Sequence, residues 1–143
     1  MKNLFYLFLL IVISSCSKDK DESTCLPLPN NKDINIVNKI TGENVFSNGT
    51  FTQNQLQIVT NPANLFSVNF TQNSGLNIFT IIPIKTEGFI NFSIVLNNEI
   101  TIPLKTKIII NNGCGTNYYF ENIISEDSNF IIEENGINLK IKI

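Results

Sequence analysis

The stretch FIIEENGINLKIKI, from Phe130 to Ile143, decides the fold class of this chain. From Ile137 to Ile143 every second residue is isoleucine or leucine, and the residues between them are asparagine or lysine. Successive side chains of a strand point to opposite faces of a sheet, so this alternation predicts a strand with one dry face and one wet face. Asn135-Gly136 separates this strand from Phe130–Glu133 and predicts a tight hairpin. The end of the chain is therefore expected to form an antiparallel pair of strands.

The same period of two runs through the chain from Ile34 onwards, with turn residues between short apolar runs. The inward positions are expected to be Phe66, Val68 and Phe70; Ile90, Phe92, Ile94 and Leu96; and Ile100, Ile102 and Leu104. Asn97-Asn98 suits a type I′ turn between the last two runs, because asparagine tolerates a positive φ. Pro83 and Pro103 are expected on edge strands or at bulges, since proline has no N–H to donate to a ladder.

No segment keeps a helical period, and roughly eight or nine short strands with turn signals between them describe an all-β fold. We expect an antiparallel two-layer β-sandwich, formed as a single domain by residues 26–143. The expected architecture resembles the immunoglobulin-like domains of secreted bacterial proteins. The Cys–Trp–Cys pattern of antibody domains is absent, because the chain has no tryptophan. A resemblance at the level of the fold assigns no function.

The N-terminus has the pattern of a secretory signal. A short charged lead precedes the unbroken apolar run from Leu4 to Ile13, which is shorter than the roughly 20 residues needed to span a bilayer. The run leads into Ile13-Ser14-Ser15-Cys16, and ISSC resembles the lipobox of bacterial lipoproteins. This resemblance implies a signal peptide at residues 1–15 and acylation of Cys16.

The segment after Cys16 contains only charged residues and serine up to Ser23, so it cannot contribute to a core. Residues 16–25 are expected to form the acylated cysteine and an extended tether. Ser17, Lys18, Asp19, Lys20, Asp21 and Glu22 are similar to the export signal of Bacteroidota surface lipoproteins, and Ile34 to Phe51 resembles the opening hairpin of flavobacterial lipoproteins. The resemblance implies an outer-membrane lipid anchor at the cell surface. A plain spacer at the periplasmic face remains the alternative.

Two further cysteines, Cys25 and Cys114, remain once Cys16 is assigned to lipid. An even pair in an oxidising compartment favours a disulfide between them. The other interpretation is a reactive thiol at Cys114, which lies in the sequence Asn-Asn-Gly-Cys-Gly. A papain-like site is excluded for that thiol, because the chain contains no histidine to act as its base.

The sequence offers little for catalysis or for metal binding. Histidine and CxxC spacing are absent, and the densest acidic group, Glu121, Glu126, Asp127, Glu133 and Glu134, lacks calcium-loop spacing. We therefore expect no metal, no cofactor and no enzyme. The runner-up is a small glycan-processing or other hydrolase with an acidic pair that the sequence does not identify. Glu43, Glu87, Glu99 and Glu121 are the carboxylates considered for such a pair.

A binding or structural accessory module is the leading expectation. The partners expected are the membrane, through the lipid anchor, and a glycan or an envelope protein. Nucleic acid is not expected, because the chain has a net charge of -2 and no arginine. Tyr118 and Tyr119 are the candidate ligand contacts, because neighbouring residues of a strand point to opposite faces and one ring should be exposed. The competing interpretation is a tyrosine at a sheet edge with a wet hydroxyl group.

Overall fold

The computed structural model describes residues 30–73, 75–84, 86–111 and 117–143. These residues form nine strands and one short 3-10 helix: β1 (Lys32–Val37), η1 (Gln53–Gln55), β2 (Leu56–Thr60), β3 (Phe66–Asn73), β4 (Leu76–Pro83), β5 (Gly88–Leu96), β6 (Ile100–Asn111), β7 (Asn117–Ile124), β8 (Ile131–Asn135) and β9 (Asn138–Lys142). Within the same ranges, no helix has the length and apolarity needed to cross a membrane.

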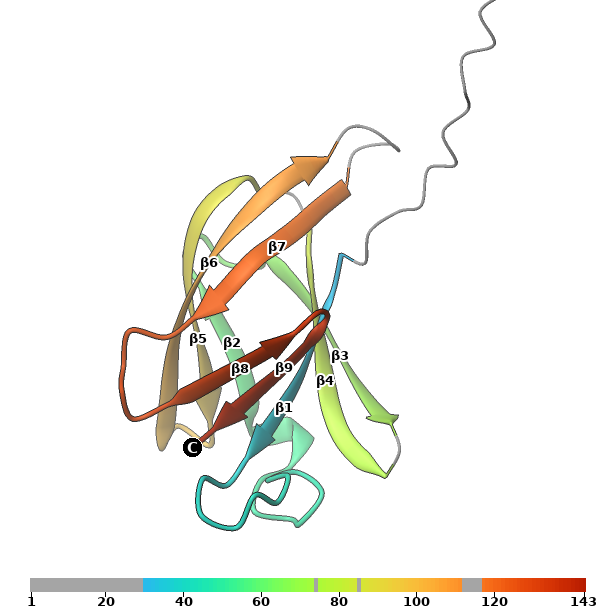
Figure 1. Ribbon diagram of the computed structural model, residues 1–143, viewed down its shortest axis with the longest axis vertical. Coiled ribbons are helices and arrows are strands. Elements are labelled where there is room, and N and C mark those ends of the chain that lie inside the picture. Colours follow the sequence, from blue (N-terminus) through green and yellow to red (C-terminus); the bar gives the residue numbers. More distant parts are fainter. Residues whose placement is uncertain (1–29, 74, 85, 112–116) are drawn as a thin grey trace, which may run out of the picture.

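The strands form two sheets that pack together as a sandwich (Figure 1). One sheet has five strands in the order β3-β4-β1-β9-β8, and the other has four in the order β2-β5-β6-β7. The predicted all-β two-layer sandwich is confirmed. The sheets are not antiparallel throughout, because β1 runs parallel to β9 over five residue pairs from Asp33↔Asn138 to Val37↔Lys142. The first and last strands of the domain are therefore neighbours in the middle of one sheet.

The core lies between the sheets and follows the predicted alternation. The inward residues of β5 and the inner residues of β9 are buried, as are Ile102 and Leu104 of β6. Three aromatic rings join the layers: Phe66 of β3 lies 5.0 Å from Phe92 and 5.5 Å from Phe120, measured between ring centroids. Such edge-to-face and tilted contacts are favourable between aromatic quadrupoles.

Val68 is the inward position that departs from the pattern. It lies on the same face of β3 as Phe66 and Phe70, yet 37% of its surface is exposed. The reason is its place in the sheet, since β3 is the edge strand of the wider, five-stranded layer. An alternating pattern assigns a side chain to a face, but it does not show whether the other layer reaches far enough to cover it.

The resemblance of Ile34 to Phe51 implies an opening hairpin, but the segment after β1 does not form its second strand. It makes one antiparallel bridge, Val37↔Asn44. The Asn44 Nδ2 group donates to the Oδ1 of Asn35 in β1, at 2.7 Å, and to the carbonyl of Asn77 in β4, at 2.9 Å. The Asn44 side chain therefore connects these two strands beyond the short stretch over which their backbones pair.

The turn between β5 and β6 has the predicted chemistry. Asn97 and Asn98 both have positive φ, at 51° and 58°, and the N–H of Glu99 donates to the carbonyl of Leu96 at 2.9 Å. Two consecutive positive φ values are the mark of a type I′ turn, as predicted for Asn97-Asn98, but Leu96 pairs with Ile100, so the loop also includes Glu99.

The last hairpin is also present, but its turn is shifted by one residue from the predicted one. Asn135 pairs with Asn138, so Gly136 and Ile137 form the loop in place of Asn135-Gly136. Gly136 has a φ of 61° at the first loop position, which is the glycine position of a type II′ turn.

Neither proline lies on an edge strand or at a bulge, so that expectation was wrong. Pro83 ends β4, an inner strand, and pairs with Phe66 at a point where β1 no longer pairs with β4. Pro103 lies in β6, also an inner strand, and pairs with Ser93 before the pairing of β6 with β7 begins at Lys105. At each proline, the strand on one side no longer pairs with the strand that contains the proline. The missing N–H therefore costs no ladder hydrogen bond.

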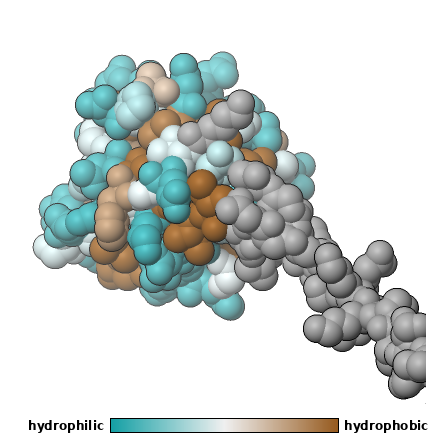
Figure 2. Space-filling view, turned by 90° about the horizontal axis from the view of Figure 1, so that it is seen from above, coloured by the Kyte–Doolittle hydropathy of each residue, from teal (hydrophilic) through white to brown (hydrophobic). Residues whose placement is uncertain are grey.

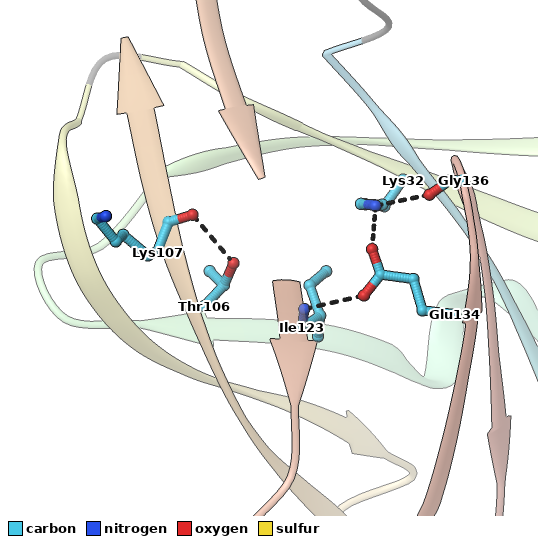
Figure 3. Close-up of polar contacts among 6 residues, drawn as sticks. All are labelled: Lys32, Thr106, Lys107, Ile123, Glu134 and Gly136. Atoms are coloured by element: carbon cyan, nitrogen blue, oxygen red, sulfur yellow. Dashed lines mark hydrogen bonds and ion pairs between the residues drawn. The ribbon is translucent and has the colours of Figure 1, made fainter. Parts of the chain in front are cut away.

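One open side of the sandwich, between β7 and β8, is closed by a polar network (Figure 3). The Nζ of Lys32, a residue only 7% exposed, donates to the Oε1 of Glu134 and to the carbonyl of Gly136, the latter at 2.7 Å. The other carboxylate oxygen of Glu134 accepts the N–H of Ile123, on β7, at 3.2 Å. One carboxylate therefore links both sheets. We call Lys32, Glu134 and the Ile123 N–H the inter-sheet network.

Candidate functional site

The outer face of the four-stranded sheet carries exposed apolar side chains on every strand. These are Val59 of β2, Phe89 of β5, Ile109 of β6 and Ile124 of β7. Single exposed apolar residues are common on proteins, but several on one face indicate a contact surface. Figure 2 looks down on the molecule of Figure 1 and shows brown apolar patches between teal hydrophilic residues on the side seen from above.

Phe89 is the most prominent of these side chains, with 76% of its surface exposed. Gly88 precedes it with a φ of +113°, a conformation that side chains rarely adopt, so the start of β5 depends on glycine. The Nζ of Lys105 lies 6.0 Å from the centroid of the Phe89 ring, and the Nζ of Lys107 lies 5.9 Å from it. Ammonium groups at this distance are attracted to an aromatic face. The ring is exposed and has two cations of β6 near it.

Two shallow hollows adjoin Lys105 on this face. One, of about 190 Å³, is lined by Phe89, Lys107, Glu121, Asn122 and Ile124 in addition to Lys105. The other, of about 390 Å³, extends along β2, β5 and β6 and includes Val59, Asn61, Asn91 and Glu126. The surface therefore combines an aromatic ring, aliphatic groups, amide groups and charges of both signs. We call the outer face of the four-stranded sheet around these hollows the Phe89 face.

An irregularity in β7 shapes the smaller hollow. Ile108 pairs with Phe120, whereas Thr106 pairs with Ile123, so Lys107 alone faces two residues of β7, Glu121 and Asn122. A bulge of this kind re-aims side chains locally. On the inner face of the sheet, next to Lys107, the buried Thr106 donates its hydroxyl to the carbonyl of Lys107 at 3.4 Å (Figure 3).

The lysines of the Phe89 face are paired with carboxylates at the surface. Lys107 Nζ lies 3.1 Å from an oxygen of Glu121, and Lys105 Nζ lies 3.5 Å from an oxygen of Glu126. Both pairs are exposed, and exposed ion pairs contribute about 0 to 1 kcal/mol. Either lysine can therefore exchange its carboxylate for an oxygen of a ligand at small cost.

Tyr118 and Tyr119 do lie on a strand, β7, but neither offers an exposed ring. Tyr118 is half-buried against the core, and Tyr119 is 6% exposed. The expectation that one ring would be exposed was wrong. β7 is an edge strand of its sheet, which agrees with the competing interpretation of tyrosines at a sheet edge.

The signal for Phe89 was present in the sequence but was not used. Ile90 and Phe92 were placed on the dry face, and Phe89 belongs to the opposite face by the same alternation. A phenylalanine at a wet position of a strand is the feature that could have identified this surface.

The remaining predicted site residues lie outside the described residues. They are Cys16, the segment Ser17 to Glu22, and the cysteines Cys25 and Cys114. The lipidation, the export signal and the disulfide therefore stay predictions.

The acidic residues first considered for calcium prove to be partners of lysines or of the backbone. Glu121, Glu126, Glu133 and Glu134 each pair with a different lysine, and Asp127 accepts the N–H of Asn129 at 2.9 Å. Across the described ranges, no group of three or more metal-binding side chains comes together. Of the four carboxylates considered for hydrolysis, Glu121 lines the smaller hollow of the Phe89 face, which contains none of the other three.

A third hollow, of about 430 Å³, lies on the five-stranded sheet and is lined by Asp33, Glu133 and Glu134 among others. Glu134 belongs to the inter-sheet network, and Asp33 accepts the hydroxyl of Thr80 at 2.7 Å. The hydrogen bond from Lys142 lowers the pKa of Glu133. The general acid of a glycosidase needs a raised pKa, so this shift has the wrong direction for Glu133 to serve as that acid.

Comparison of this chain with protein-family models, with curated proteins and with solved structures finds no match. The function proposed below therefore rests on the residues described above.

Proposed function

We propose that this protein is a lipid-anchored lipoprotein of the bacterial cell envelope and that its sandwich is a non-enzymatic binding module. The Phe89 face is the binding surface. The observation that supports this assignment is the exposed Phe89 ring with Lys105 and Lys107 beside it and hollows around it. The support for the anchor is the resemblance of Ile13-Ser14-Ser15-Cys16 to a lipobox.

A glycan is the ligand class that fits this surface best. The exposed face of an aromatic ring packs against the C–H groups of a sugar ring, and flanking polar groups fix its orientation. Asn91 and Asn122 supply amide donors and acceptors beside the hollows, and Lys105 and Lys107 can donate to hydroxyl or carboxylate oxygens. Shallow, open hollows suit a chain of sugars better than a small molecule that must be enclosed.

Replacing Phe89 by alanine is expected to weaken binding to the glycan at least about tenfold, equivalent to about 1.4 kcal/mol, because the stacking surface is removed. The measurement is binding of the full-length chain to an array of neutral and acidic polysaccharides, followed by titration of the best one. Because Phe89 is exposed, the thermal unfolding temperature should be almost unchanged.

Phe89→Tyr, which keeps the ring, should retain binding. Ile40→Ala is the matched control, because Ile40 is an exposed apolar residue in a loop outside this face. A polysaccharide that binds Phe89→Ala as tightly as the unchanged chain would contradict the assignment of this face. If no polysaccharide binds, an envelope protein becomes the ligand class to test.

The disulfide between Cys25 and Cys114 belongs to the same proposal, since it would join the end of the tether to the domain. It would close a loop of about 90 residues and contribute about 4 kcal/mol to stability in the chain-entropy view. Peptide mapping of the non-reduced protein should show one peptide that contains both residues. Two thiols that alkylate in the native protein would contradict the pairing and would leave Cys114 as a free thiol.

A further inference from the structure

The four edge strands of the sandwich differ in how they are protected against pairing with another chain. A strand at the edge of a sheet presents unpaired N–H and C=O groups, and proteins usually block such edges with charges, bulges, prolines or short length. The edges here are β3 and β8 in one sheet and β2 and β7 in the other. Three of the four carry at least one of these protective features.

On one side of the sandwich, β7 and β8 are both protected. β7 has an irregular register and carries Glu121, and β8 carries Glu133 and Glu134. The inter-sheet network also occupies the N–H of Ile123 on β7. On the opposite side, β2 is short, with five residues.

β3 has none of these protections. It has eight residues, Phe66–Asn73, with the sequence FSVNFTQN, which contains no charge and no proline. It pairs with β4 in an unbroken register from Phe66↔Pro83 to Asn73↔Leu76, so it has no bulge. Within the part of the chain that the structure describes, β4 is its only strand neighbour. β3 is therefore a regular, neutral and unprotected edge.

We propose that two copies of this chain pair through β3, antiparallel and about a two-fold axis at Asn69. Because β3 is neutral, self-pairing brings no like charges together, whereas self-pairing of β8 would oppose its glutamates. Five strands from each copy then form one continuous sheet of ten.

The side chains favour this register. In a continuous sheet, the two residues of each pair must point to the same face. Because faces alternate along a strand, the paired residues are then both even-numbered or both odd-numbered. The two-fold axis therefore passes between the two copies of one residue. With the axis at Asn69, Val68 pairs with Phe70 of the partner copy, and Ser67 pairs with Thr71. The 37% of Val68 that is exposed then packs against an aromatic ring. With the axis at Phe70, Val68 would face the polar Gln72, and with the axis at Val68 it would face the smaller side chain of a second Val68 in place of an aromatic ring.

The test is site-directed disulfide formation in membranes of cells that express the full-length chain. Asn69 is exposed on the outer face of β3, so Asn69→Cys leaves the core intact and places two thiols opposite one another. Mild oxidation should convert most of this variant into a species of twice the mass on a non-reducing gel. The unchanged chain, oxidised in the same way, is the control for any dimer that forms through its own cysteines.

Thr71→Cys is the matched control, one position further along the same exposed face. Its two copies would lie roughly 13 Å apart along the strand, four residues at roughly 3.3 Å each, which is too far for a disulfide. Co-expression of Ser67→Cys with Thr71→Cys, on copies with different tags, should give a mixed dimer.

Three results would overturn the proposal. The first is that Asn69→Cys forms no dimer beyond the level of the unchanged chain. The second is equal cross-linking of Asn69→Cys and Thr71→Cys, which would indicate random collision. The third is cross-linking of Asn69→Cys to a different protein, which would mean that a strand of another partner occupies this edge.

Discussion

Glu134→Ala is expected to lower the free energy of unfolding by about 3 kcal/mol, the lower end of the range for breaking a buried ion pair. Without the carboxylate, the buried Lys32 ammonium keeps, among the described residues, only the carbonyl of Gly136 as an acceptor, and the Ile123 N–H loses the Glu134 oxygen. The Glu134 side chain is 22% exposed, so water can replace part of the lost contact, which is why the lower end applies. Urea unfolding followed by circular dichroism measures the change.

Two variants separate the inter-sheet network from a general effect of removing charge. Glu133→Ala removes the neighbouring carboxylate, whose partner Lys142 lies at the surface, and should change stability little. Replacing both Lys32 and Glu134 by methionine should recover most of the loss, because no buried charge is then left alone. Equal destabilisation by Glu133→Ala and Glu134→Ala would contradict the role assigned to this network.

Cys16→Ala is expected to abolish attachment of fatty acid and to leave either the uncleaved precursor or a mislocalised protein, so that its partitioning into membranes changes. The physical reason is that each buried CH₂ of an acyl chain contributes about 0.8 kcal/mol, and stable anchoring needs two chains. The serine-rich and charged segment from Ser17 to Ser23 offers no apolar surface that could replace them. Incorporation of labelled palmitate and partitioning into detergent measure the two effects.

Cys25→Ala is the control, because this thiol follows the tether and should not affect acylation. If Cys16→Ala still incorporates palmitate and stays in the membrane, the lipoprotein assignment is wrong.

Protease treatment of intact cells then distinguishes the two orientations of the anchored protein. Digestion from outside supports export directed by Ser17 to Glu22, whereas protection until the outer membrane is opened indicates a periplasmic domain.

The fold class could be predicted because the alternation in β5, β6 and β9 is local and strict. Ile90, Phe92, Ile94 and Leu96 are all buried as expected. The parallel pairing of β1 with β9 could not be predicted, since it joins Asp33 to Asn138 and no local pattern carries that information. The exposure of Val68 has the same origin, because it depends on the reach of the opposite sheet.

The candidate site was only partly accessible to sequence reasoning. Alternation places Phe89 on a wet face, but the approach of Lys105 and Lys107 to its ring depends on the pairing of β5 with β6. The sequence pattern identifies no partner for the acidic residues near the C-terminus, whereas the strand registers bring Glu121 to Lys107 and Glu133 to Lys142. Ion pairs between strands follow from register, which a single sequence does not specify.

The position of β1 has a mechanical consequence if the chain is held at its N-terminus. β1 lies between β4 and β9, in the middle of the five-stranded sheet, and it is the first strand after the tether. The part of a pulling force that is not carried by the proposed disulfide between Cys25 and Cys114 would act on β1 and load its hydrogen bonds to both neighbours together, in shear. An edge strand pulled from its end would instead unzip one bond at a time. If the proposed anchor holds the chain, the sandwich should therefore resist unravelling from its anchored end.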